Sequence, residues 1–357
     1  MSGESSRYTS DRRSPGESSW ADEADWVAGV AKNAEVVGGE LVGRPPTQAS
    51  VPDAVASYRH IGSTDGELHA VNASDGSEKW TYATGGQVRS SPAIVDGVVY
   101  VGSRGGGLHA VNSLNGSKKW TYATGDRIRS SPAVVDGVVY VGSNGQSLHA
   151  ISVADGAENW TFGGTDGLSS PAVVDGVVYV GSYDGNLYAV DASTGAVQWS
   201  YATGDSIFSS PAVVDGVVYV GSIDNNLHAV DAQDGSEKWT YATGDRIYSS
   251  PTVVDGVVYV GSTDDNLYAV DAQNGSEKWT YATGKAIYTA PAVVGGVVYV
   301  GDSFGRLHAI DASDNSEKWV YSTEGGTYYS SPISGADGWC FVNRPGRIGN
   351  TEPIKPF

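Results

Sequence analysis

The sequence predicts an all-β fold, a β-propeller built from four-stranded blades of about 40 residues each. The segment SSPAVVDGVVYVGS recurs along the chain, with identical copies that begin at Ser130, Ser169 and Ser209 and near-copies that begin at Ser90, Ser249, Thr289 and Ser330. Tryptophan repeats with the same period, at Trp80, Trp120, Trp160, Trp199, Trp239, Trp279 and Trp319. Between these landmarks, short apolar runs alternate with turns rich in Gly and Asp, which is the pattern of short antiparallel strands.

One copy, residues 209–244, shows how each strand is predicted. Pro211–Val214 and Val217–Gly221 are joined by Asp-Gly, a dipeptide typical of two-residue hairpin turns because both central positions take positive φ. Leu227–Val230 follows the turn IDNN as a third strand, and Lys238–Ala242 follows the turn QDGS as a fourth. One twisted sheet cannot bury both of its faces, so the blades are expected to stack into a closed ring.

The repeats also set the expected domain boundaries. Full copies cover about 49–329, another copy starts in 330–344, and 21–48 contains two apolar patches. We expect the two end segments to combine into a closing blade, which gives eight blades, with seven blades as the alternative. A single propeller then spans 21–344, residues 1–20 are disordered, and 345–357 form an irregular tail.

The chain is strongly acidic, with 41 Asp and Glu against 22 Lys and Arg, a net charge of -19 and a pI of about 4.5. This charge disfavours nucleic acid as a partner, and it is a balance also found in salt-adapted, halophilic proteins. The one cysteine, Cys340, cannot form an internal disulfide. No apolar run reaches the roughly 18 residues of a membrane span. The chain as written has no signal peptide, so as written it is expected in the cytoplasm. We also expect a monomer.

The segment AVDASTGAVQW (Ala189–Trp199) has the pattern A-x-D-x-x-T-G-x-x-x-W. It resembles the tryptophan-docking motif of the PQQ-type, quinoprotein-like β-propeller repeats, and weaker copies end at Trp239, Trp279 and Trp319. The resemblance implies a ring of WD40-like architecture in which the recurrent tryptophans dock one blade onto the next. It also implies two functional branches: dehydrogenases that hold pyrroloquinoline quinone and Ca²⁺, and non-catalytic, BamB-like propellers. Members are usually exported or associated with the cell envelope.

We expect this chain to belong to the non-catalytic branch. The quinone-dependent dehydrogenases resemble one another in a pair of cysteines beside the quinone, which a single cysteine cannot supply. The acidic residues recur with the repeat, whereas catalysis needs one acid or base at one place. The prediction is a binding or scaffold module for a protein or peptide, with no catalytic residue, cofactor or metal. A sensor or regulatory domain of a larger protein is the first alternative, and a quinone-dependent dehydrogenase is the second.

Histidine and tyrosine exchange at one position of the predicted third strand. Histidine stands there in most copies, and Tyr188 and Tyr268 replace it in two. This exchange indicates that the histidines pack as amphipathic side chains rather than bind a metal. The histidines at this position are His69, His109, His149, His228 and His308.

The copies differ mainly in two loops: the linker into each Pro-containing strand, and the turn between the second and third strands. We expect both loops on one face of the ring, around its central channel. Aromatic and arginine side chains are favoured anchors in protein interfaces. The residues predicted to form the partner-binding face are Arg89, Arg104, Arg127, Arg129, Phe208, Arg246, Tyr248, Tyr288 and Tyr329.

Overall fold

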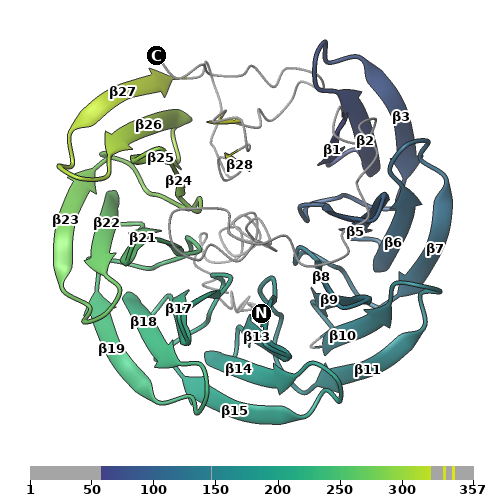
Figure 1. Cartoon of the computed structure of the whole chain (residues 1–357), viewed down its shortest axis with the longest axis horizontal. Coiled ribbons are helices and arrows are strands. Elements are labelled where there is room, and N and C mark those ends of the chain that lie inside the picture. Colours follow the sequence, from purple (N-terminus) through teal and green to yellow (C-terminus); the bar gives the residue numbers. More distant parts are fainter. Residues whose placement is uncertain (1–57, 146, 323–332, 335–339, 342–357) are drawn as a thin grey trace, which may run out of the picture.

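The structure is a ring of antiparallel sheets arranged in chain order about a central axis (Figure 1). This computed structural model describes residues 58–145, 147–322, 333–334 and 340–341, and these residues contain strands and turns only. The prediction of an all-β propeller is therefore confirmed. No helix in the described part is long and apolar enough to cross a membrane.

Seven sheets of three or four strands form the blades, numbered here 1 to 7 along the chain. In the complete blades the first strand lies nearest the axis and the fourth lies at the rim (Figure 1). Blade 1 is described from its second strand onward. The strands of blades 1 to 3 are β1 (Tyr58–Gly62), β2 (Glu67–Asn72) and β3 (Glu78–Ala83), then β4 (Ala93–Val95), β5 (Val98–Gly102), β6 (Gly107–Asn112) and β7 (Lys118–Ala123), then β8 (Ala133–Val135), β9 (Val138–Ser143), β10 (Ser147–Ser152) and β11 (Glu158–Gly163).

Blades 4 to 7 repeat the same four-strand order. Their strands are β12 (Ala172–Val174), β13 (Val177–Gly181), β14 (Asn186–Asp191) and β15 (Val197–Ala202), then β16 (Ala212–Val214), β17 (Val217–Gly221), β18 (Asn226–Asp231) and β19 (Glu237–Ala242), then β20 (Thr252–Val254), β21 (Val257–Gly261), β22 (Asn266–Asp271) and β23 (Glu277–Ala282), then β24 (Ala292–Val294), β25 (Val297–Gly301), β26 (Arg306–Asp311) and β27 (Glu317–Ser322).

The Asp-Gly turn between the first two strands of a blade has the predicted geometry. Asp215 has φ 50° and Gly216 has φ 71°, and the flanking residues Val214 and Val217 pair directly across the hairpin. Positive φ at both central residues gives the turn a twist that matches the twist of the two strands. The sequence therefore predicted this hairpin from two residues.

The hydrophobic core lies between blades rather than within one blade. A representative cluster joins Tyr179, Leu187 and Ala189 of blade 4 to Val218 and Val220 of blade 5, all of them at most 4% exposed. Within the described blades, neighbouring sheets thus bury their facing sides against each other. At about 25 cal/mol per Å² of buried apolar surface, this stacking is the main source of the ring's stability.

The expected closing blade is only partly within the described residues. β28 (Ile333–Ser334) pairs antiparallel with β29 (Cys340–Phe341), and β28 contacts β24, as the innermost strands of successive blades contact one another. The strands expected from 21–48 lie outside the described residues, as do 1–20 and 345–357. The seven sheets of three or four strands fit the alternative count of seven blades.

Candidate functional site: the linker face of the ring

The two variable loops lie against each other, as the sequence predicted. Each linker accepts a backbone hydrogen bond from the turn of the blade that it leads into; for example, the Arg104 N–H donates to the Gln87 carbonyl at 2.8 Å. The same linker also donates to the turn of the blade that it leaves, from Val88 N–H to the Ser63 carbonyl at 2.9 Å. Linkers and turns therefore form a continuous hydrogen-bonded belt, which we call the linker face.

A row of aromatic rings crosses this face from blade to blade. The centroids of Tyr183 and Phe208 are 4.3 Å apart, those of Phe208 and Tyr248 are 5.4 Å apart, and those of Tyr248 and Tyr288 are 5.6 Å apart. The second and third distances fall within the usual range of attractive aromatic pairs, and the first is slightly shorter. The structure thus brings three of the predicted aromatic residues together, and Tyr183, which comes from the turn set, extends the row at one end.

The arginines predicted for this face are placed in different ways. Arg127 and Arg246 are exposed, Arg89 and Arg104 are half-buried, and Arg129 is buried. Arg104 Nη1 donates to Gln87 Oε1 at 3.1 Å, so its side chain is held within the belt. Arg127 and Arg246 are therefore the two predicted arginines that are most accessible to a partner.

Electrostatic effects link two of these arginines to the aromatic row. The hydroxyl of Tyr248 lies beside the Arg246 guanidinium and raises the pKa of Arg246. Burial raises the pKa of Tyr183 to about 12, against a smaller lowering effect from Arg129. One arginine thus lies near each of two positions in the row.

At blade 7 the turn between the second and third strands carries an exposed aromatic residue beside the position that bonds to the linker. Ser303, not Phe304, takes the turn position that bonds to the linker, through its N–H to the Ala286 carbonyl at 2.8 Å. Phe304 follows it and is 64% exposed, with Lys285 Nζ 4.2 Å from its ring centroid. Tyr329, the last aromatic residue predicted for this face, lies outside the described residues.

The recurrent tryptophans contact the next blade in a uniform way. The indole Nε1 of Trp199 donates to the Ala232 carbonyl of blade 5 at 3.1 Å, and the Tyr179 hydroxyl donates to the same carbonyl at 3.1 Å. Equivalent indole bonds of 3.0 to 3.2 Å start from Trp80, Trp120, Trp160, Trp239 and Trp279. For Trp319, the structure records a ring contact with Tyr299 at 5.9 Å.

Sequence reasoning missed a polar contact between blades that involves the third-strand histidines. The Tyr201 hydroxyl, from the outer strand of blade 4, donates to Glu237 Oε2 at 2.6 Å and lies 3.0 Å from His228 Nδ1 in blade 5. The same group of tyrosine, histidine and glutamate recurs with Tyr122 and with Tyr281. The residues lie 27 and 36 positions apart, so their spacing in a single repeat gives no sign of the contact.

Burial keeps one of these histidines neutral. Burial, aided by repulsion from Lys118, lowers the pKa of His109 to about 4, so its imidazole is uncharged at pH 7. The Tyr82 hydroxyl lies 3.1 Å from its Nδ1. The arrangement is that of a packed polar side chain.

The carboxylate of Asp302 does not recur with the repeat, which corrects the expectation that all acidic residues recur with it. Asp302 stands where other blades have Ser, such as Ser222, and it is fully buried. It bonds to Arg306 Nε at 2.5 Å and to His308 Nε2 at 3.2 Å. Burial raises the pKa of Asp302, but these bonds outweigh burial and hold the pKa below its ordinary value. Asp302 also accepts a hydrogen bond from the Phe304 N–H, so its carboxylate stabilises the turn in which it lies.

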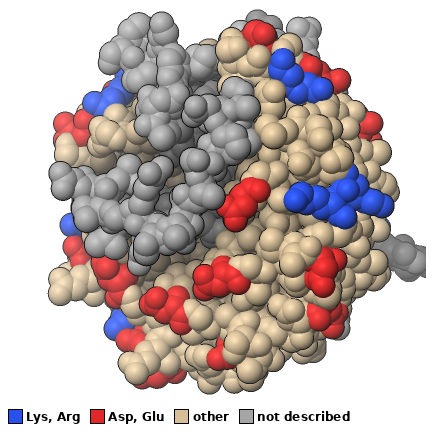
Figure 2. All heavy atoms as spheres, turned by 45° about the vertical axis from the view of Figure 1, so that its right-hand side comes forward, with Lys and Arg blue, Asp and Glu red and all other residues tan. Residues whose placement is uncertain are grey.

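Acidic side chains are spread over the surface, whereas Lys and Arg gather at a few places in the face that Figure 2 shows. With a net charge of -19, exposed arginines such as Arg127 and Arg246 are local exceptions to the sign of the surface. A cation on an acidic surface can select an anionic group of a partner by charge complementarity. The linker face therefore combines buried and half-buried aromatic rings with two exposed arginines, each of which follows an aspartate in the sequence.

Comparisons with known proteins agree on the architecture. The profile of the family described as outer membrane protein assembly factor BamB matches residues 15–161, 123–210, 159–249 and 204–345. The crystal structure of BamB from Moraxella catarrhalis is similar with a TM-score of 0.71 and 21% sequence identity, covering 80% of this chain and 91% of that one. The computationally designed Ika8 protein is similar with a TM-score of 0.73 and 16% identity, covering 80% of this chain and 90% of that one.

A comparison with curated protein sequences gave no match. The two structures share less than a quarter of their residues with this chain and therefore support the fold alone. The family profile, in contrast, matches segments that together span nearly the whole propeller. On that basis the chain belongs to the family of PQQ-type propeller repeats described as outer membrane protein assembly factor BamB.

Proposed function

We propose that the chain is a non-catalytic binding or scaffold module that takes a protein or peptide partner on its linker face. The observation that carries the proposal is the continuous row of rings from Tyr183 to Tyr288, with exposed Arg127 and Arg246 on the same belt. Aromatic side chains lose little conformational freedom on binding, and arginine offers several hydrogen-bond donors in a planar group, so both types are favoured interface anchors.

The belt supports this function because its backbone is fixed. Most of the described linkers are hydrogen-bonded to the turns of both neighbouring blades, so the side chains on them are presented by an ordered backbone. A rigid surface pays less entropy when it binds than a flexible loop does. Variation between copies is concentrated on this belt, while the strands beneath it are nearly identical. The family's printed description, an assembly factor, is consistent with a role in binding other proteins.

The test compares two triple variants that are matched in composition. The first, Arg127→Ala with Arg246→Ala and Phe304→Ala, removes two exposed cations and one exposed ring from the linker face. The second, Lys79→Ala with Lys119→Ala and Leu114→Ala, removes two exposed cations and one exposed apolar side chain near the outer strands.

Both variants and the parent protein are immobilised and exposed to an extract of the source organism at its growth salt concentration. A partner of the linker face is captured by the parent and by the outer-strand variant, and at least about tenfold less by the linker-face variant, a loss of about 1.4 kcal/mol or more. Equal capture by all three proteins would contradict the proposed face.

The non-catalytic part of the proposal has its own test. The purified protein is mixed with pyrroloquinoline quinone and Ca²⁺, and the quinone absorbance and dye-linked alcohol oxidation are followed. We expect neither a shifted absorbance nor turnover. Turnover that depends on the quinone would show that the protein is an enzyme, whatever the outcome of the capture experiment.

A further inference from the structure

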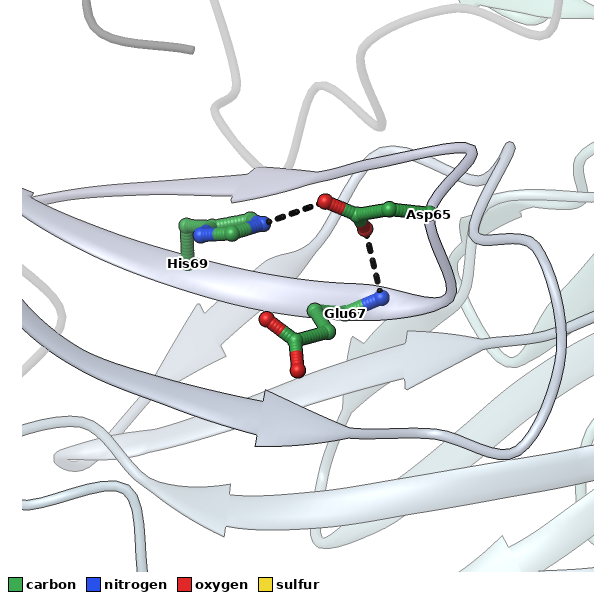
Figure 3. Close-up of side chains that lie close together, drawn as sticks. All are labelled: Asp65, Glu67 and His69. Atoms are coloured by element: carbon green, nitrogen blue, oxygen red, sulfur yellow. Dashed lines mark hydrogen bonds and ion pairs between the residues drawn. The ribbon is translucent and has the colours of Figure 1, made fainter.

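Blade 1 brings together three side chains of types that bind metal ions. Ligand atoms of Asp65, Glu67 and His69 all lie within 4.8 Å of one another (Figure 3). Asp65 lies in the turn between β1 and β2, while Glu67 and His69 occupy alternate positions of β2 and so leave the same face of that strand. Within the described residues, this is the group of three or more His, Cys, Asp or Glu side chains that meets such a distance limit.

The imidazole of His69 is held between carboxylates. Its Nε2 lies 3.1 Å from Asp65 Oδ2, and its Nδ1 lies 3.5 Å from Glu78 Oε2 on β3. The His69 side chain is 5% exposed, and its Nδ1 makes no hydrogen bond within the described part of the chain. Histidines that bind metals commonly direct the second ring nitrogen at a carboxylate, which fixes the ring orientation. Glu78 is placed to do this for His69.

The distance between the Asp65 carboxylate and the His69 imidazole suits a shared divalent ion. Two ligand atoms that each lie about 2.1 Å from a tetrahedral ion are about 3.4 Å apart. Asp65 Oδ2 and His69 Nε2, at 3.1 Å, need only a small adjustment to share one ion. The Glu67 N–H donates to Asp65 Oδ1 at 2.9 Å, which orients the carboxylate so that Oδ2 faces the His69 ring.

Blade 5 shows what is particular to blade 1. There, Asp224 and His228 form the same pair at 3.1 Å, but Asn226 stands at the position of Glu67. His228 Nδ1 faces the Tyr201 hydroxyl at 3.0 Å instead of a carboxylate. The pair of Asp and His therefore occurs in blades 1 and 5, whereas the second carboxylate, Glu67, occurs in blade 1. At the position of Glu67, the other blades have Gly107, Ser147, Asn186, Asn266 and Arg306.

We propose that Asp65, Glu67 and His69 form a binding site for one divalent transition-metal ion of the Zn²⁺ class, with water completing the coordination. One imidazole with two carboxylates suits Zn²⁺ and its neighbours in the first transition row, whereas Ca²⁺ and Mg²⁺ take oxygen ligands. The Asp65 side chain is 39% exposed, so an ion can reach the site from solvent. This site departs from the expectation, drawn from sequence, that the histidines only pack.

The test is calorimetric titration with Zn²⁺ of the full chain after treatment with a chelator. The parent protein is compared with Glu67→Asn, which gives blade 1 the residue of blade 5, and with Glu67→Gln, which keeps the shape of the side chain. The matched control is Asn226→Ser, which gives blade 5 the residue found in blade 3. Melting temperatures in the presence of chelator report whether each variant is folded.

We expect the parent and the control to bind one equivalent of Zn²⁺ saturably, and both Glu67 variants to bind at least about tenfold more weakly. Bound Co²⁺ gives a visible absorption band in the parent that is lost in the Glu67 variants, and an equal concentration of Ca²⁺ does not displace Zn²⁺. Absence of saturable binding in the parent would overturn the proposal. So would equal affinity in the parent and either folded Glu67 variant, or a loss in Asn226→Ser as large as that in Glu67→Asn.

Discussion

The contact between Gly235 and Trp199 gives a sharp test of how tightly neighbouring blades fit. Gly235 lies in the turn before the last strand of blade 5, with φ 75°, and a methyl group added there would lie 2.8 Å from the Trp199 ring of blade 4. Gly216 has nearly the same conformation, φ 71°, but nothing lies within 4 Å of an added methyl group. Gly235→Ala and Gly216→Ala therefore share the cost of a left-handed alanine, and only Gly235→Ala adds a steric clash.

The left-handed conformation costs an alanine about 1–2 kcal/mol, and this cost is common to both variants. Overpacking against the indole adds about 1–3 kcal/mol to the cost of Gly235→Ala. At about 2 °C per kcal/mol for a chain of this size, we expect Gly235→Ala to melt about 2–6 °C below Gly216→Ala. Thermal unfolding followed by tryptophan fluorescence measures the difference. Equal melting temperatures would show that the indole does not press on the glycine and would refute the reasoning.

Two further predictions concern the polar groups of blade 5. Tyr201→Phe removes a hydroxyl that bonds to Glu237 and contacts His228, so it should lower the free energy of unfolding by about 1 kcal/mol; no loss in urea unfolding at pH 7 would contradict this. Burial raises the pKa of Asp224, but bonds from His228 and the Gly204 N–H outweigh it and lower the pKa from 3.8 to about 2. A lowered pKa contributes stability above the unfolded value and loses it as the pH falls through the folded value, so the advantage of the parent over Asp224→Asn should be full above pH 4 and shrink toward pH 2. An advantage that grows with acidity would contradict the assignment.

Much of the fold could be predicted from sequence because local signals and the repeat agreed. The Asp215-Gly216 turn follows from conformational preferences of two residues, and the period of the tryptophans places every blade. The contact between linkers and turns could also be predicted, since both loops leave the same end of a four-stranded blade. The seven described sheets fit the alternative of seven rather than the preferred eight, and the segment expected to complete an eighth blade lies outside the described residues.

The candidate site was less predictable because burial depends on distance from the ring axis, which sequence does not give. Arg129 and Arg127 look equivalent in sequence, yet Arg129 is 6% exposed whereas Arg127 is an exposed surface residue. The exchange of histidine with tyrosine predicted that the histidines pack against neighbouring side chains. His109 is buried and contacts Tyr82 in this way. The same exchange gave no sign that His69 lies between the carboxylates of Asp65 and Glu78. Glu67 was the available signal, because it is the acidic residue at a position that is neutral or basic in every other copy.

The indole bond from Trp199 to the Ala232 carbonyl connects blade 4 to its immediate successor, and the same bond starts from the recurrent tryptophan of each of blades 1 to 6. A genetic duplication or deletion of one 40-residue unit would therefore join two ends that already fit, with no new interface to evolve. The number of blades could change by unequal recombination between such similar stretches of coding sequence. Each product would form the same indole-to-carbonyl hydrogen bond where the two blades join. Selection on the diameter of the ring could then act separately from selection on what the loops recognise.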